Sequence, residues 1–304
     1  MVIGIDLGAT NIHAGVIDEE GTIIEEEVKK AHYDIGKDAV IGQLIDIIQS
    51  FHHKFPTIKK AGFVCPGPMD IKEGVLLNLT NHSDWGVIPI VDILKDSTGL
   101  DITFDNDATG AALAEGWVGR AKDLSTFMAI TLGTGVGTGI VLGGKVYRST
   151  TGGSEWGHIM MSLDGSYKCG CGNMGCIETY CSATALVYLA RDSGMNNIAS
   201  ARDVCLLAEE DDALALSVLD KYSRFLAIAL YNYIIILNPE MIVLGGGLST
   251  SARLFLPKAK QYLKTFLHER EDIKPVEIVA TSFPDQAGII GAAYLCMEHK
   301  RIAV

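Results

Sequence analysis

The chain has 304 residues, of which 48% are hydrophobic, so it is long enough for about two domains with a large core. Its formal net charge is −12 and no run of Lys and Arg exceeds two residues, which argues against a protein that binds nucleic acid or an anionic membrane. The opening stretch, MVIGIDLGATN, has no basic segment ahead of its apolar residues, and the longest apolar run, FLAIALYNYIIIL, is too short to span a bilayer. We therefore expect a cytoplasmic protein that binds neither nucleic acid nor membranes.

Hydrophobic patterning predicts strands and helices that alternate along the chain. Residues 1–28 predict three short strands, separated by turns at Gly8-Ala9-Thr10 and Glu20-Gly21. A helix is expected at about residues 36–54, and a strand follows within 59–68, where two prolines end it. The pattern then predicts a helix at 88–100, a strand at 101–104 and a helix at 105–119. A strand with a glycine turn and a hairpin follows at 127–147, and one further strand, at 241–247, lies in a mainly helical remainder. This mixture indicates an α/β protein.

Three glycine-rich turns each follow an apolar strand: GIDLGATN, ITLGTGVGTG and IVLGGGLS. Glycine allows positive φ and close backbone approach, so that successive N–H groups can point at phosphate oxygens. A single turn of this kind is more often only a tight connection, but three of them favour a phosphate site. Asp6 could hold magnesium directly or through water, and Thr10 and Thr134 offer hydroxyl groups. The first two turns together predict a site for ATP.

Asp105, Asn106 and Asp107 lie where a predicted strand ends and a helix begins. Asp and Asn are favoured as helix N-caps, so one of the three can have this structural role. Alternatively, Asp107 accepts the proton of an attacking hydroxyl while Asn106 fixes the substrate, because phosphoryl transfer mainly requires positioning and one suitable base. The sequence by itself leaves both interpretations open.

A glycine-rich loop carries one histidine and three of the chain's seven cysteines: His158, Cys169, Cys171 and Cys176. One imidazole and three thiolates match the Cys₃His set of structural zinc sites, in which the protein supplies all four ligands. Glu155 precedes the histidine by three residues and Glu178 follows the last cysteine by two. A metal that closes the loop would bring both carboxylates onto one frame, which suits them to bind the hydroxyl groups of a polyol.

These motifs, with DLGAT, PGP, NDATGAALAEG, LGTGVGTGIVLGGKVYRSTTGGSEWGH, CGCGNMGCIE and LGGG in this order, resemble the ROK family of sugar kinases and repressors. The resemblance covers essentially the whole chain. It implies an α/β, two-lobed, actin-like ATPase (ribonuclease H-like) fold, with mixed sheets flanked by helices and a ligand cleft between the lobes. The small lobe would comprise residues 1–106, rejoined by a C-terminal helix at about 288–304. The large lobe would comprise 107–287 and contain the zinc loop 155–178.

The resemblance also implies an ATP-dependent kinase that phosphorylates a hexose hydroxyl, here expected to be O6 of glucose, with Asp107 as the base. Its cofactors would be ATP, Mg²⁺ and structural Zn²⁺, with zinc bound by His158 and the three cysteines. The implied nucleotide contacts are Asp6, Gly8, Ala9, Thr10, Asn11, Gly133, Thr134, Gly135, Val136, Gly137, Gly245 and Gly246. The implied sugar contacts are Gly67, Asn81 (or Asn78 in its place), Asn106, Asp107, Glu155, His158 and Glu178. Enzymes of this kind are usually homodimers or homotetramers.

Three other functions are compatible with parts of the sequence. The acceptor could be another sugar, such as N-acetylglucosamine, N-acetylmannosamine, fructose, allose or a β-glucoside. A non-catalytic sugar-sensing regulator of the same family is a second alternative, although repressors carry a helix-turn-helix segment ahead of the first strand, which begins here at Val2. An actin- or Hsp70-like ATPase without a sugar is the third, but it would leave the zinc loop and the two glutamates without a purpose.

Overall fold

The computed structural model describes residues 1–77, 85–149, 153–163, 165, 167–268, 270, 272–297 and 302–303. The chain forms two compact units. The first consists of Met1–Ala129, Gly139–Ser154 and Asp285–Val304, and the second of Ile130–Thr138 and Glu155–Pro284. The expected lobe boundary after residue 106 stays a prediction; in the structure the helix that follows it is grouped with the first unit.

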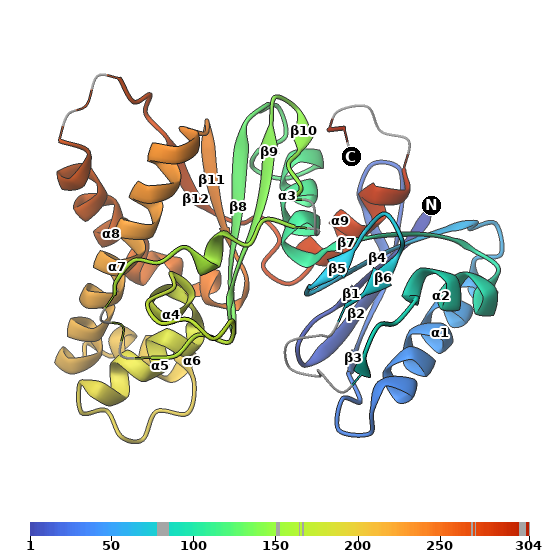
Figure 1. Cartoon of the computed structure of the whole chain (residues 1–304), viewed down its shortest axis with the longest axis horizontal. Coiled ribbons are helices and arrows are strands. Elements are labelled where there is room, and N and C mark those ends of the chain that lie inside the picture. The colour runs from blue at the N-terminus through green and yellow to red at the C-terminus, as the bar shows by residue number, and fades with distance from the viewer. Residues whose placement is uncertain are drawn as a thin grey trace. The chain divides into compact units, whose positions relative to one another are not determined.

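The first unit contains a five-stranded sheet in the order β3-β2-β1-β4-β7 (Figure 1). Its strands are β1 (Val2–Leu7), β2 (Asn11–Ile17), β3 (Ile23–Lys30), β4 (Lys60–Cys65) and β7 (Asp101–Asn106). The first three are antiparallel, whereas β4 and β7 continue the sheet parallel to β1. Asp6 pairs in register with Val64, and Cys65 with Asn106, so the predicted acidic residues are brought to one edge of the sheet.

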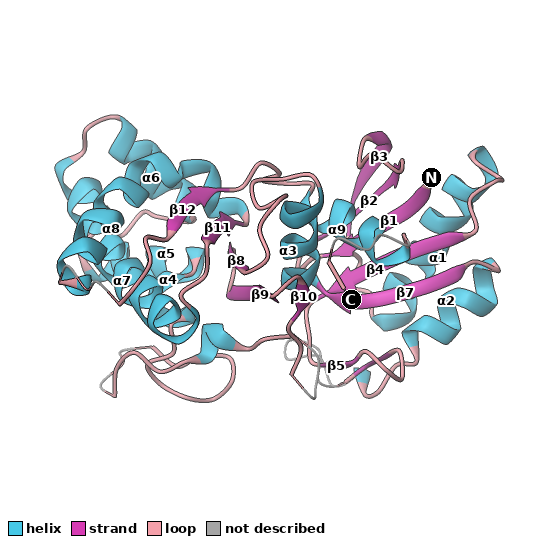
Figure 2. Ribbon diagram, turned by 90° about the horizontal axis from the view of Figure 1, so that it is seen from above, coloured by secondary structure: helices cyan, strands magenta, loops and turns pink. Residues whose placement is uncertain are grey.

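Helices pack on both faces of this sheet because β1 alternates large and small side chains. Ile3 and Ile5 share a buried cluster with α1 (Lys37–Lys54) and α2 (Ile90–Thr98), which Figure 2 shows along β1, β4 and β7. Gly4 points to the other face, where a Cβ would lie 2.0 Å from the carbonyl oxygen of Ile289. That face packs against α9 (Ala287–Cys296), which also packs on α3 (Asp107–Trp117). The same unit contains a short hairpin of β5 (Met69–Asp70) and β6 (Val75–Leu76).

A second five-stranded sheet has the order β10-β9-β8-β11-β12. Its strands are β8 (Phe127–Leu132), β9 (Val136–Leu142), β10 (Lys145–Val146), β11 (Met241–Gly245) and β12 (Glu277–Ala280). The predicted hairpin turns at Gly143 and Gly144, which both have positive φ. The prediction of a single strand after residue 147 was wrong, because β12 also pairs in parallel with β11. This strand has only four residues at a sheet edge, which is too short for a clear alternation.

The remaining described elements of the second unit are helical. They are η2 (Trp156–His158), α4 (Glu178–Cys181), α5 (Ala183–Asp192), α6 (Ala201–Glu209), α7 (Ala213–Leu237), η3 (Gly247–Ser251) and α8 (Ala252–Leu267). α7 packs on α8, where the ring of Tyr222 meets that of Phe255 edge-on. Within the described residues, no helix combines the length and apolar character needed to cross a membrane. Mixed sheets flanked by helices confirm the predicted α/β fold class.

Candidate functional site

The carboxylates of Asp6 and Asp107 come together in the first unit, near the ends of β1 and β7. Burial of the Asp6 carboxylate, and next the charge of Asp107, raise the pKa of Asp6 to about 7. Asp6 also lies against the first turn of α9, where a Cβ on Gly288 would be only 2.1 Å from Asp6 Oδ2. A glycine is therefore needed at this position for the carboxylate to sit at the helix. A divalent cation would offset both effects that raise the pKa, so Asp6 is suited to hold Mg²⁺.

The structure assigns different roles to Asp105, Asn106 and Asp107, which lie where β7 ends and α3 begins. Asn106 is the N-cap, because its Oδ1 accepts hydrogen bonds from the backbone N–H groups of Ala108 at 3.0 Å and Thr109 at 3.3 Å. Asp105 is 0% exposed and is paired with Arg148, whose Nε donates to Asp105 Oδ2 at 3.1 Å. Capping therefore does not account for Asp107, although its Oδ1 also accepts from the Ala108 N–H at 2.8 Å.

Arg148 was not found by sequence reasoning. Burial raises the pKa of Asp105, and the guanidinium of Arg148 opposes this shift. Asp105 Oδ1 in turn accepts the backbone N–H of Asn106 at 2.8 Å, so the ion pair fixes the corner that carries Asn106 and Asp107. The two partners are 43 residues apart, and no local pattern announces such a pairing.

Residues 133–137, the turn between β8 and β9 together with the first two residues of β9 and here called the glycine turn, are held by hydrogen bonds from the segment that enters α5. The backbone N–H of Ala183 donates to the carbonyl oxygen of Gly133, and the hydroxyl of Thr184 donates to that of Thr134, both at 2.8 Å. Glu178 Oε2 accepts the backbone N–H of Val136 at 3.0 Å. The turn is thus fixed in shape while Thr134 stays exposed, which suits it to bind an anionic ligand.

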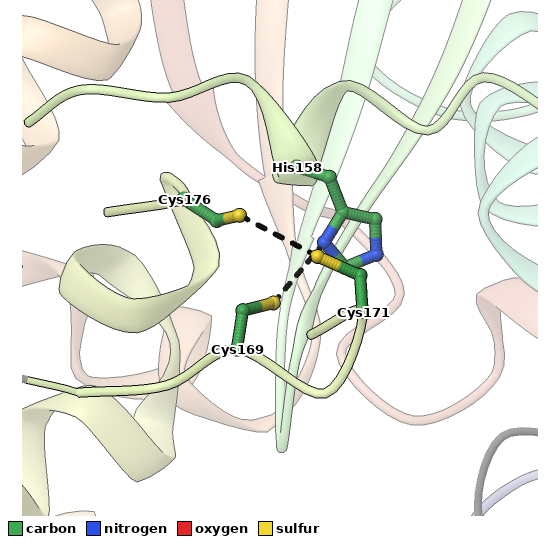
Figure 3. A group of neighbouring side chains, drawn as sticks. All are labelled: His158, Cys169, Cys171 and Cys176. Carbon is green, nitrogen blue, oxygen red and sulfur yellow. Dashed lines mark hydrogen bonds between the residues drawn. The ribbon is translucent and has the colours of Figure 1, made fainter. Parts of the chain in front are cut away.

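The four predicted metal ligands meet in the second unit. One ligand atom from each of His158, Cys169, Cys171 and Cys176 lies within 4.8 Å of all the others, and Figure 3 shows the imidazole directed at the thiols. The sulfur atoms of Cys171 and Cys176 are 3.7 Å apart, and Cys169 Sγ is 3.3 Å from His158 Nδ1. A tetrahedral zinc with Zn–S bonds of about 2.3 Å would require S–S and S–N separations of about 3.8 and 3.6 Å. The donor set and its spacing therefore fit zinc.

Both predicted glutamates contact this cluster. Glu155 Oε2 lies 3.7 Å from His158 Nε2, the ring nitrogen that is not directed at the thiols. Glu178 Oε1 lies 3.3 Å from Cys169 Sγ. The Glu155 side chain is 64% exposed, so it is open to a ligand.

A cavity of about 800 Å³ lies within the second unit. Its walls come from the glycine turn, the start of α5, α6 with its N-cap, and η3: Gly133, Thr134, Ala183, Ser200, Ala201, Arg202, Cys205, Leu206, Glu209, Gly247, Leu248, Thr250 and Ser251. Gly245 and Gly246, two of the predicted nucleotide contacts, immediately precede this wall and do not themselves line it. The contribution of α6 was missed by sequence reasoning, although Ser200 and Asp203 form a capping box that marks the start of the helix.

The remaining predicted contacts that the structure describes lie in the first unit. Gly8, Ala9 and Thr10 form the turn after β1, and Asn11 begins β2; the hydroxyl of Tyr33 donates to the carbonyl oxygen of Gly8 at 3.0 Å. Gly67 follows β4 in the same unit. Asn81 and its alternative Asn78 lie outside the described residues. The functional roles of all these residues remain predictions.

Comparisons with known proteins agree with the motifs. The ROK family model matches residues 2–299. A glucokinase from Halalkalibacterium halodurans is 32% identical, over 98% of this chain and 95% of that protein. An N-acetyl-D-glucosamine kinase from Haemophilus influenzae is 30% identical, over 97% of this chain and 99% of that protein. Among solved structures, a ROK family glucokinase from Streptomyces griseus in complex with glucose and AMPPNP superposes with a TM-score of 0.86 at 27% identity, covering 97% of this chain and 98% of that one.

Proposed function

This chain belongs to the ROK family, and on that premise we propose that it is an ATP-dependent sugar kinase. The predicted family is confirmed, and the proposal concerns what this chain does within it. The observation that carries the proposal is the corner at the end of β7. There Asn106 caps α3 and Asp105 pairs with Arg148, while Asp107 stands near Asp6 without being needed as the cap.

In the proposed reaction, Asp107 accepts the proton of a sugar hydroxyl as the oxygen attacks the γ-phosphorus of ATP. The new O–P bond forms as the bond to the bridging β,γ-oxygen breaks, and ADP leaves with that oxygen. Mg²⁺, where bound, neutralises charge on the phosphates. Asp6 would hold it, and the N–H groups of the turns at residues 8–11 and 133–137 would bind phosphate oxygens.

The cavity of the second unit is proposed to take the adenosine. Its walls include Gly133 and Thr134 of the glycine turn, residues of α6 and residues of η3, so a nucleotide with its phosphates on the turn could place its base beside α6. Gly245 and Gly246 would support this site from behind η3. In Gly246 the φ is 75°, and a Cβ would lie 2.7 Å from the backbone of Leu132, so only glycine fits there.

The proposed acceptor is a hexose, with O6 of glucose as the expected position. Gly67, Asn81, Asn106, Glu155, His158 and Glu178 would bind its hydroxyl groups. Zinc would be structural, bound by His158 and the three cysteines, because the protein supplies a complete tetrahedral set and leaves no open position for catalysis.

Release of ADP from MgATP across a sugar panel tests the proposal. The panel should contain glucose, N-acetylglucosamine, N-acetylmannosamine, fructose, allose and a β-glucoside, and we expect the highest kcat/KM with glucose. ADP release with another member would correct only the sugar. If sugars bind and ADP stays at background throughout, the protein is a sugar-sensing regulator and the kinase proposal is wrong.

Filling the cavity should weaken nucleotide binding selectively. At Gly247 a Cβ meets nothing within 4 Å, so Gly247→Leu would extend from this wall without a clash of its backbone. We expect KM for ATP to rise about tenfold or more with little change in kcat, because ground-state binding is lost. Gly42→Leu on α1 is the matched control, since its Cβ also meets nothing within 4 Å. Equal effects of both variants would argue against a nucleotide in this cavity.

A further inference from the structure

We propose that Glu178 is a positioning residue for the glycine turn 133–137, and that it acts on nucleotide binding through the backbone of that turn. The inference rests on the proposed function, in which this turn binds the phosphates of ATP. It adds a second role to a glutamate whose expected role was to contact the sugar.

The carboxylate of Glu178 contacts the turn directly. Oε2 accepts the backbone N–H of Val136 at 3.0 Å, and a Cβ on Gly135 would lie 2.3 Å from the same oxygen. Val136 is buried and its carbonyl side is also tightly packed, since a Cβ on Gly157 would lie 2.1 Å from the Val136 oxygen. The peptide groups around Val136 are therefore held from two sides, and Glu178 supplies the charged acceptor on one of them. Hydrogen bonds to a charged acceptor are stronger than those between neutral groups.

Glu178 is itself placed by the metal loop. It begins α4 two residues after Cys176, and the Ile177 N–H donates to the Ile159 carbonyl at 2.8 Å, which ties this stretch to the segment that follows His158. Its second oxygen, Oε1, accepts a hydrogen bond from the Cys169 thiol at 3.3 Å; a zinc-bound thiolate cannot donate this bond, so with zinc bound the backbone from Cys176 to Glu178 places the side chain. One side chain thus connects the cysteine cluster with the turn. The Glu155 side chain, in contrast, contacts only His158 among the described residues.

The proposed role predicts that substituting Glu178 weakens nucleotide binding, which substitution of a glutamate that only binds sugar would not do. Without the carboxylate, the Val136 N–H loses its acceptor and the turn can leave the shape in which its other N–H groups face one ligand. With Gln at this position, the amide oxygen can still accept from Val136. The two substitutions therefore separate the hydrogen bond from the charge.

Nucleotide affinity without sugar tests this inference. Calorimetric titration of the zinc-loaded protein with AMPPNP and Mg²⁺ should give a Kd about tenfold higher or more for Glu178→Ala, the size expected for losing a hydrogen bond to a charged acceptor. Glu178→Gln should stay within about threefold of the wild type, since the bond is retained. Glu155→Ala is the comparison: its glucose affinity should fall while its nucleotide affinity stays unchanged. An unaltered AMPPNP affinity in Glu178→Ala would overturn the positioning role.

A wild-type protein that does not bind AMPPNP would refute the proposed function and leave Glu178 to be tested by hydrogen exchange. The amide of Val136 should then exchange at least about tenfold faster in Glu178→Ala than in the wild type, and close to the wild-type rate in Glu178→Gln. Equal rates in all three proteins would refute the inference itself. Circular dichroism of each variant shows whether a loss comes from unfolding, and the Gln variant decides the matter if the Ala variant does not fold.

Discussion

Replacing Asp107 with Asn should lower kcat by about 10²–10⁴-fold, the usual cost of removing a positioned general base. The amide has the same shape and its oxygen can still accept the Ala108 N–H, which Asp107 Oδ1 now accepts at 2.8 Å. It cannot take the proton of the sugar hydroxyl, so binding should survive while turnover is lost. Steady-state kinetics and calorimetric titration with glucose and with AMPPNP measure the two effects separately.

The control for this variant is Asp101→Asn, at the start of the strand that leads to Asp107. Asp101 is the first residue of β7, and its side chain is exposed and 3.7 Å from Lys95 Nζ, so kcat should stay within about twofold of the wild type. Asp107→Asn also removes the charge that contributes to the raised pKa of Asp6, so the pKa of Asp6 should fall. A variant that retained half of the wild-type kcat would show that Asp107 is not the base.

At the corner between β7 and α3, the strand end and the helix start were predictable from the sequence, but the role of each of the three residues was not. The run Asp105, Asn106, Asp107 announced a strand end and a helix start, which the structure contains. Which residue caps depends on where the strand ends: Asn106 is the last residue of β7, and from its extended backbone its side chain reaches the N–H groups of Ala108 and Thr109. Capping propensity ranks Asp and Asn about equally and could not decide between them.

The metal cluster was predictable because its chemistry is rare and its ligands are close in sequence. The contacts that give the surrounding residues their roles are not local. Arg148 reaches Asp105 across 43 residues, and Glu178 reaches Val136 across 42. The cavity is lined by segments that come before and after α7 in the sequence, and no periodicity in any one of these segments predicts the others. Pattern reasoning therefore found the elements and the ligand set, while the positioning contacts needed the tertiary structure.

Loss of the metal should have the widest effect on this protein. We expect one zinc per chain in the purified protein and none in Cys171→Ser, which removes the one exposed thiol of the four-ligand set. A metal that binds only the folded chain stabilises it, so the variant should also unfold at a lower temperature. Cys181→Ser is the control, because Cys181 is a buried thiol of α4 outside the set and its substitution should leave the zinc content unchanged.

The binding effects of zinc loss follow from the two glutamates. Glucose affinity should fall by about tenfold or more, because His158 and Glu155 lose the frame that orients them. AMPPNP affinity should fall as well, because Glu178 follows Cys176 by two residues and holds the turn through Val136. If Glu178 carries this second effect, zinc removal by a chelator should weaken AMPPNP binding in the wild type and add little in Glu178→Ala. Fully active protein that contains no metal by elemental analysis would contradict the whole scheme, because the loop would then hold both glutamates without an ion.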